Sequence, residues 1–268
     1  MDSILDLLYD PSQKRRKRRV MVYGPDGVGK STWAAQSPRP LFLQTEDGLS
    51  GIKGVKALPR CLTVKAFGDQ VNGLLALDPF PFGTIVIDSL TGLEPIAQER
   101  ALQLYNEEHK PVDAYEAIPY GKGPQFAVKA WKRILDLFER FNIEKDVTVI
   151  LIGHAQVVRF ADPTGDAFDR YAPKLEKDVS AAVREWCDEY FFASHKVYTT
   201  TEGAGFRERK KATGGSDRVL KTFGAGAFLA KRRIAMPDEI EMTWQAYQQC
   251  VDANIEERGI AALDEEIV

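Results

Sequence analysis

The sequence has few cysteines and no long apolar run. Its cysteines, Cys61, Cys187 and Cys250, lie far apart and form no C-x-x-C pair, so neither a zinc site nor a disulfide framework is suggested. We expect them to be buried as small hydrophobic residues. No apolar stretch approaches the roughly 20 residues of a membrane-spanning helix, and the N-terminus lacks the hydrophobic core of a signal peptide. These absences predict a cytoplasmic protein.

The chain also has little net charge, but its charges are unevenly distributed. A formal charge of −3 accompanies 44% hydrophobic and 28% charged residues, a composition typical of a soluble globular protein with one large domain. Residues 14–19 are all basic, and residues 196–233 contain ten Lys or Arg against three acidic residues. This segregation suits a protein that holds a polyanion on one face, although solvated loops would explain the pattern equally well.

A glycine-rich segment follows the apolar run 20–23, which is typical of a buried strand. The segment fits G-x-x-x-x-G-K-[ST], the Walker A pattern of a phosphate-binding loop. Its glycines let the backbone turn tightly and direct N–H groups at phosphate oxygens, and the following helix would add the positive end of its dipole. Lys30 is predicted to neutralise the β- and γ-phosphates, and Ser31 to ligate Mg²⁺. The predicted nucleotide-binding residues are Gly24, Pro25, Asp26, Gly27, Val28, Gly29, Lys30, Ser31 and Thr32.

Strands and helices alternate along the rest of the chain. Predicted strands cover residues 41–45, 61–64, 84–89, 147–152 and 189–193, and predicted helices cover 31–36, 65–77, 90–105, 124–141, 179–186 and 238–253. Residues 157–174 favour a hairpin or loop around Pro163-Thr164-Gly165, and further strands are expected over 197–222. The helix at 124–141 is expected to bury one face, formed by Trp131, Ile134, Leu135 and Phe138.

The strand at residues 84–89 carries an acidic residue near its end. Asp88 stands where a parallel strand would finish, downstream of Lys30, which is the Walker B pattern. Such a carboxylate normally orders Mg²⁺ through water, so Asp88 and Ser31 should face each other across the metal. The predicted cofactors are therefore ATP and Mg²⁺.

The order Lys30, Glu46, Asp88 and His154 resembles the RecA, RadA and KaiC branch of P-loop ATPases. More closely, the chain resembles the small phage-encoded RecA-like recombination ATPases of the single-strand-annealing (Sak) type. The resemblance implies an α/β fold: a RecA-like P-loop core over residues 18–250, with a mostly parallel central sheet flanked by helices and a C-terminal β-hairpin extension. Residues 1–17 would form an N-terminal arm and residues 251–268 an acidic tail. A phage-encoded protein would work in the cytoplasm of the host cell.

The same resemblance implies two catalytic roles next to the phosphates. Glu46 matches the glutamate that positions and polarises the attacking water, and the adjacent Asp47 is the alternative. His154 matches the residue that senses the γ-phosphate from the strand beside the phosphate loop. Gln156 is the alternative sensor, and a purely structural histidine is the other interpretation.

A basic triplet implies a contribution from a neighbouring subunit. Lys231-Arg232-Arg233 resembles the K-N-R motif with which RadA-like and DnaB-like subunits reach the neighbour's γ-phosphate, except that Arg replaces the central Asn. Lys231 and Arg233 would then be catalytic, and hydrolysis would depend on assembly. A basic strand end on the surface is the competing interpretation.

DNA-binding residues are expected in three places. Residues 106–123 and 157–174 occupy the places of the family's two DNA-binding loops and offer the aromatic and cationic groups that single strands need, although three Asp residues weaken the case for the second loop. The basic stretch 207–221 could carry more of the affinity, and phosphate contacts there would make binding salt-dependent. The candidates are Tyr120, Lys122, Arg159, Arg170, Arg207, Arg209, Lys210 and Lys211.

The predicted function is that of an oligomeric Mg-ATP-dependent ATPase that binds single-stranded DNA in recombination or annealing, with ATP at the subunit interface. The expected partners are single-stranded DNA and further copies of the chain in a ring or filament, with a single-strand-binding protein as another candidate and no membrane. One alternative is a hexameric helicase or loader-type motor. The other is a KaiC-like nucleotide switch that does not bind DNA.

Overall fold

The computed structural model describes residues 8, 10, 16–202 and 209–258. Its framework is a nine-stranded sheet in the order β3-β2-β4-β5-β1-β7-β8-β9, with β6 paired to β5 off this path. Neighbours from β3 to β7 are parallel, whereas β6, β8 and β9 join antiparallel. The strands are β1 (Arg19–Gly24), β2 (Pro40–Gln44), β3 (Lys56–Ala57), β4 (Thr84–Asp88), β5 (Thr148–Phe160), β6 (Phe168–Pro173), β7 (Glu189–Glu202), β8 (Arg209–Lys221) and β9 (Glu239–Glu241).

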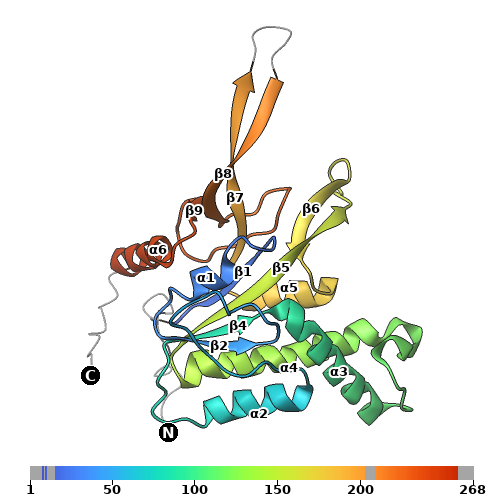
Figure 1. The fold of residues 1–268 in the computed structure, drawn as a ribbon. Helices are drawn as coiled ribbons and strands as arrows, with labels where there is room; N and C mark the ends of the chain where they lie inside the picture. The colour runs from blue at the N-terminus through green and yellow to red at the C-terminus, as the bar shows by residue number, and fades with distance from the viewer. Residues whose placement is uncertain (1–7, 9, 11–15, 203–208, 259–268) are drawn as a thin grey trace.

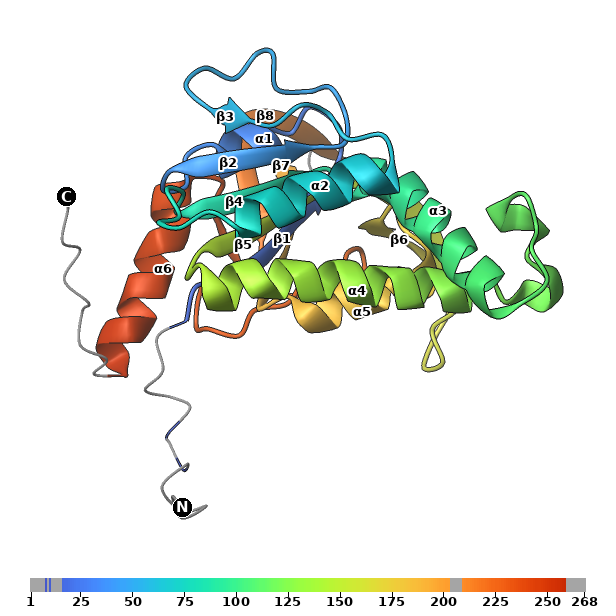
Figure 2. The same cartoon turned by 90° about the horizontal axis from the view of Figure 1, so that it is seen from below.

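Helices cover both faces of this sheet, as Figures 1 and 2 show. One face packs against α2 (Val64–Leu75), α3 (Leu90–Glu108), α4 (Gly123–Glu144) and α5 (Lys177–Trp186). The other packs against α1 (Lys30–Ala34) and α6 (Trp244–Glu257). Two short 3₁₀ helices, η3 (Tyr115–Ala117) and η4 (Pro119–Gly121), connect α3 to α4.

The packing of the central strand β1 explains why its residues 20–23 are all apolar. Met21 and Tyr23 pack into the core under α2 to α5, and Val20 and Val22 pack into the core under α1 and α6. A parallel strand covered on both faces has no solvent side, so it does not alternate apolar with polar residues. The same burial applies to helix α4, where Trp131, Ile134, Leu135 and Phe138 are all buried, which confirms the predicted apolar face.

The predicted strand at residues 61–64 is wrong. The short strand next to β2 lies earlier, at Lys56–Ala57, and Thr63 is instead the N-cap of α2, where its hydroxyl accepts a hydrogen bond from the Ala66 N–H (3.2 Å). Cys61 is buried and Leu62 is exposed, so this short stretch has the alternation of a strand. The capping threonine, which starts a helix, decides the structure here.

Other elements differ from the sequence-based expectation mainly in length. β5 continues beyond residue 152 to Phe160 and pairs with β6, so the predicted hairpin over residues 157–174 is confirmed. The predicted closing helix at 238–253 is divided: β9 pairs with β8, and α6 begins only after Thr243, whose hydroxyl accepts from the Ala246 N–H (3.2 Å). Cys61 and Cys187 are buried as expected, whereas Cys250 is half-buried.

Beyond the core, β7 and β8 form a long antiparallel hairpin that projects away from the helices (Figure 1). This topology confirms the predicted α/β fold class, with a mostly parallel central sheet flanked by helices and a C-terminal β-hairpin extension. The expected N-terminal arm and acidic tail fall largely on residues outside the described ranges, and α6 continues past residue 250 to Glu257. Within the described part of the chain, no helix has the length and apolar character needed to cross a bilayer.

Candidate nucleotide-binding site

Residues far apart in the sequence meet at one edge of the sheet. β1, β4 and β5 run parallel, and β1 and β4 end at the same edge, level with the middle of β5. Open α/β sheets bind ligands at the carboxyl ends of their strands. The register pairs Gly24 with His154 and Gln44 with Asp88. The structure thereby places the phosphate loop, the acidic strand ends and His154 around a common space.

The phosphate loop has the backbone that its glycines permit. Gly27 (φ +73°) and Gly29 (φ +96°) adopt left-handed conformations that other residues rarely tolerate. A Cβ at Gly24 would lie 2.4 Å from the Ala193 carbonyl oxygen, so this position requires glycine for close packing. Helix α1 has only five residues, shorter than the expected 31–36, and its dipole is correspondingly small. Any attraction for a phosphate at this loop would therefore come mainly from the loop N–H groups and Lys30.

Lys30 lies buried within the curve of the loop. Its Nζ donates hydrogen bonds to the backbone oxygens of Gly24 (3.0 Å) and Pro25 (2.9 Å). Burial lowers the pKa of Lys30, although the nearby carboxylates of Asp26 and Asp88 oppose this effect. Because neutral carbonyls compensate a buried ammonium only in part, an anion entering the loop would gain a strong charge-assisted contact.

Asp88 has the environment that a magnesium ligand needs. Burial raises the pKa of its carboxyl group, against the opposing effect of the nearby Ser31 hydroxyl. Among the described residues its Oδ2 atom is buried without a hydrogen-bond partner. A buried oxygen without a partner is costly, and a hydrated Mg²⁺ ion would satisfy it. The residues present therefore fit Mg²⁺, with Ser31 and Asp88 as the groups that would hold it.

His154 links two carboxylates across the phosphate-binding space. Its Nε2 lies 2.8 Å from Glu46 Oε1, and its Nδ1 contacts the Asp26 carboxylate. The hydrogen bond to Glu46 is the largest cause that raises the pKa of His154. Burial would raise the pKa of Glu46, but the contact with His154 lowers it overall. Both ring nitrogens can donate only in the doubly protonated imidazolium, so this arrangement favours a charged histidine.

The alternative candidates for the catalytic and sensor roles, Asp47 and Gln156, do not contact His154 or Glu46 in this way. Asp47 is exposed to solvent, whereas the neighbouring Glu46 is half-buried against His154. Gln156 lies farther along β5, where its Nε2 donates to the Pro173 carbonyl (3.1 Å) and braces the β5–β6 hairpin. The geometry therefore brings Glu46 and His154, but neither Asp47 nor Gln156, into the contact network around Lys30.

Sequence reasoning missed the residues that hold these strand ends together. The Thr45 hydroxyl donates to the Ser89 carbonyl (2.6 Å) and accepts from the Ser89 N–H (2.9 Å), which fixes Glu46 relative to Asp88. A Cβ at Gly92 would lie 2.6 Å from the Thr45 hydroxyl oxygen, so that glycine makes the close approach possible. The Thr91 hydroxyl accepts a hydrogen bond from the backbone N–H of His154 (3.1 Å). The only sequence signal was their position next to Glu46 and Asp88.

The basic triplet lies away from this edge within the same chain. Lys231 bridges in an antiparallel manner to Tyr190, which pairs with Met21 in the first half of β1. The Lys231 Nζ donates to the Arg184 carbonyl at the end of α5 (2.6 Å). Arg233 forms an ion pair with Asp188 (3.1 Å). Neither cation reaches its own phosphate loop in this structure, so any contact with phosphate would have to be made to another copy.

The candidate DNA-binding loops present mixed surfaces. On the β5–β6 hairpin, Arg170 lies 3.8 Å from the centre of the Phe160 ring, and Arg159 pairs with Asp169 (3.3 Å). Asp162 is occupied locally, since it accepts hydrogen bonds from the backbone N–H and the hydroxyl of Thr164. The acidic residue 162 is therefore part of the turn.

The other candidates lie on the α3–α4 connection and on the long hairpin. Tyr120 is 94% exposed, with a left-handed backbone (φ +59°), and Lys122 precedes α4 half-buried. Arg207 lies outside the described residues. Three further candidates lie on the backbone of β8, opposite residues 200–202 of β7: Arg209, Lys210 and Lys211.

Proteins similar to this chain include a curated relative and a number of solved structures, among them the two that follow. The SPbeta prophage-derived uncharacterized protein YorG of Bacillus subtilis (strain 168) is 25% identical over 181 residues, which are 65% of this chain and 50% of that protein. The chain thus spans about half the length of this curated relative. The flagellar accessory protein FlaH from Methanocaldococcus jannaschii is 12% identical (TM-score 0.41, 84% of each chain covered), and the RadB recombinase is 14% identical (TM-score 0.43, 86% of this chain and 90% of that one).

The family comparison covers most of the molecule that has just been described. A family described as an AAA domain matches residues 16–234, which include the phosphate loop, Glu46, Asp88, His154 and the basic triplet. The match extends over far more than half of the 268 residues. The chain therefore belongs to the AAA_24 family of AAA-domain proteins.

Proposed function

We propose that this protein is an oligomeric Mg-ATP-dependent ATPase that binds single-stranded DNA and acts in recombination or annealing. The observation that carries the proposal is the convergence of Lys30, Asp88 and the Glu46–His154 pair on one phosphate loop. Membership in a family of AAA domains supports nucleotide-dependent activity. DNA binding and assembly rest on the resemblance to RecA-like recombination ATPases and on the placement of the candidate loops.

Each residue at the site has a defined role in this proposal. Lys30 neutralises the β- and γ-phosphates, while Ser31 and Asp88 hold Mg²⁺, which supplies further charge neutralisation when it is bound. The Glu46 carboxylate accepts a hydrogen bond from the attacking water and orients it. His154 exchanges its contact with Asp26 for one with the γ-phosphate, since both are anions within reach of its ring. The histidine would thereby report which nucleotide is bound.

Glu46→Gln tests the hydrolytic role, and Asp47→Asn is the matched control on the adjacent residue. We expect Glu46→Gln to bind ATP as the wild type does but to hydrolyse it at least about 100-fold more slowly, because the amide cannot act as a base. Asp47→Asn should keep wild-type turnover. The measurement is steady-state phosphate release together with ATP affinity. Equal turnover in Glu46→Gln and wild type would remove Glu46 from the mechanism.

The DNA-binding proposal has a specific supporting arrangement. The β5–β6 hairpin offers Phe160 with the Arg170 guanidinium stacked on its ring, a pairing of aromatic and cationic groups that suits bases and phosphates. Labelled single-stranded oligonucleotide should bind at low salt, with affinity that falls as salt rises. If ATP binds but the oligonucleotide does not, the result favours the nucleotide-switch alternative over DNA binding. ATP-driven unwinding of a duplex would instead indicate a helicase-type motor.

The biological setting is part of the same proposal. The prophage-derived relative supports a phage-encoded protein that works in the cytoplasm of the host cell. A single-strand-binding protein is then a further candidate partner, because it would occupy the same DNA. Lys231 and Arg233 would complete the site of a neighbouring copy in a ring or filament.

A further inference from the structure

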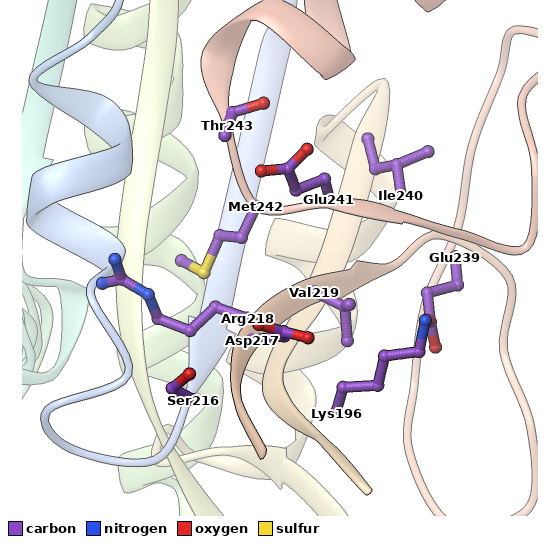
Figure 3. Close-up of a pocket in the computed structure, with 10 residues that line it drawn as sticks. All are labelled: Lys196, Ser216, Asp217, Arg218, Val219, Glu239, Ile240, Glu241, Met242 and Thr243. Atoms are coloured by element: carbon purple, nitrogen blue, oxygen red, sulfur yellow. The ribbon is translucent and has the colours of Figure 1, made fainter. Parts of the chain in front are cut away.

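One arginine, Arg218, approaches the phosphate loop from the side opposite to Asp88 and His154. Arg218 lies on β8, in register with His195 of β7, and its guanidinium packs against Gly29. A Cβ built on Gly29 would lie 2.2 Å from Arg218 Nη1, so the glycine leaves room for this contact. No salt bridge between the Arg218 guanidinium and a carboxylate is found among the described residues. Figure 3 shows the Arg218 side chain extended toward α1 and its preceding loop.

The order of strands in the sheet predicts how a bound nucleotide would be oriented. β1 lies between β5 and β7, so His154 and Asp88 flank the phosphate loop on one side and Arg218 flanks it on the other. The proposed magnesium ligands and the γ-phosphate sensor occupy the β4–β5 side. A triphosphate whose γ-phosphate lies there would extend its nucleoside toward β7 and β8, where Arg218 is.

A pocket lies next to Arg218 on this side. It occupies about 540 Å³ in the corner between β8, β9 and the turn into α6, and Figure 3 shows its lining residues. Pockets for small molecules usually measure about 300–1,000 Å³. Carboxylates of Glu239 and Glu241 line it, the first in ion pairs with Lys221 and Lys196, and Met242 contributes a thioether. Carboxylates repel phosphate but accept hydrogen bonds from ribose hydroxyls and base amino groups, so this lining suits a nucleoside better than a polyanion.

We propose that this pocket receives the ribose and base of the nucleotide and that Arg218 binds the phosphate nearest to them. The inference rests on the proposed nucleotide binding and adds the orientation of the ligand and a cation supplied by the same chain. Arg218 acts on the phosphates in its own subunit, unlike Lys231 and Arg233, which would act on a neighbour. Gly29 is required for its left-handed backbone conformation (φ +96°), and the absence of a side chain there lets the end of Arg218 lie against the loop.

Titration with two ligands tests the phosphate contact of Arg218 and the nucleoside pocket separately. ATP has three phosphates and a nucleoside, and inorganic tripolyphosphate has the phosphates alone. Arg218→Ala should weaken the binding of both ligands by about tenfold or more, because a charge-assisted contact is lost for each. Arg133→Ala, which removes an exposed arginine of α4, is the matched control and should bind both as the wild type does.

A second variant fills the pocket without touching the phosphate loop. Ser216 is exposed on β8 and lines the pocket, and a tryptophan is well tolerated on a strand. Ser216→Trp should weaken ATP binding by about tenfold or more but leave tripolyphosphate binding unchanged. Thermal unfolding of each variant checks that the fold is retained.

The outcomes separate this inference from the proposed function. If wild type binds ATP, Lys30→Ala does not, and Arg218→Ala binds both ligands normally, the arginine assignment is overturned. Unchanged ATP affinity in Ser216→Trp overturns the nucleoside pocket. If wild type binds neither ligand, or if Lys30→Ala binds as wild type does, the nucleotide site itself is wrong.

Discussion

At the residue scale, the site depends on how charges are compensated before any nucleotide arrives. Lys30 is held by neutral carbonyls, Asp88 has a buried oxygen without a partner among the described atoms, and His154 is shared by two carboxylates. In the proposed function, each of these groups would gain a better partner when a metal-bound triphosphate enters. Without a ligand, contacts with His154 hold the carboxylates of Asp26 and Glu46 in place.

This chain of three residues predicts a pH window for stability. Glu46 raises the pKa of His154 above its ordinary value of 6.5. The stability that the protonated histidine adds to the fold is therefore complete below about pH 6.5, and it is lost as pH rises through the pKa of His154 in the folded protein. The contact with His154 lowers the pKa of Glu46 from 4.5 despite burial. The stability that the ionised Glu46 adds is therefore complete above about pH 4.5, and it is lost as pH falls through the lowered pKa. The chain should therefore stabilise the protein most between about pH 4.5 and 6.5.

The measurement is the free energy of unfolding of wild type and His154→Gln in urea across pH 4 to 9. The difference between the two proteins should be largest in that window and should shrink toward pH 9, because the imidazolium is then deprotonated. A difference that grows steadily toward pH 9 would show that His154 is neutral in the folded protein.

At the scale of elements, buried ion pairs join β1 to β7 at the end opposite to the site. Arg19 forms a two-point contact with Asp188, with Nη2–Oδ1 at 2.9 Å and Nε–Oδ2 at 3.2 Å. Arg18 contacts Glu189, which is fully buried and also accepts from the Tyr247 hydroxyl (3.1 Å). Within the basic run at residues 14–19, Arg18 and Arg19 therefore stabilise the fold. Because their charges are paired, they are not available to bind a polyanion.

Asp188→Asn should be strongly destabilising. Asp188 is 3% exposed and faces both Arg19 and Arg233, so the substitution removes one carboxylate from two cations, of which Arg19 keeps a second ion pair with Glu139 (2.9 Å). Breaking a buried pair of this kind costs about 3–5 kcal/mol. Asp69→Asn, which breaks the exposed Lys65–Asp69 pair on α2, is the control and should cost less than about 1 kcal/mol. Equal losses in urea unfolding would contradict a special role for the buried pair.

Some elements could be predicted from the sequence and others could not. The phosphate loop could be predicted because its signal lies in consecutive residues, and β1 and β4 because strands buried on both faces form apolar runs. β3 and the start of α2 were predicted incorrectly because Cys61 to Thr63 fits both a strand and a helix cap. The contact of Arg218 with Gly29 could not be predicted, since it depends on strand order and not on local pattern.

At the scale of the whole molecule, the site and the candidate DNA-binding segments are joined by packed side chains. The Tyr23 hydroxyl, at the end of β1, donates to the Leu229 carbonyl (2.7 Å) and accepts from the Leu229 N–H (2.9 Å). Tyr171 of β6 stacks on Phe192 of β7 with ring centres 5.0 Å apart. A change at the phosphate loop therefore has a direct packed route to the β5–β6 hairpin and to the segment before the basic triplet.

Mixing experiments test the shared site between copies. Lys30→Ala lacks the phosphate lysine and Lys231→Ala lacks the proposed contribution to a neighbour, so each alone should be nearly inactive. In a mixture, some interfaces combine an intact Lys30 from one copy with an intact Lys231 from the next, and ATP hydrolysis should partly recover. Absence of recovery at every ratio, with both variants assembling normally, would exclude a site shared in this way.

The most direct test of the central claim is calorimetric titration of ATP, with and without Mg²⁺, into wild type and Lys30→Ala. We predict that wild type binds ATP more tightly when Mg²⁺ is present and that Lys30→Ala weakens this binding by at least about tenfold, because the buried ammonium no longer meets the phosphates. Equal affinity for Mg-ATP in the two proteins would contradict a triphosphate bound between Lys30 and Asp88.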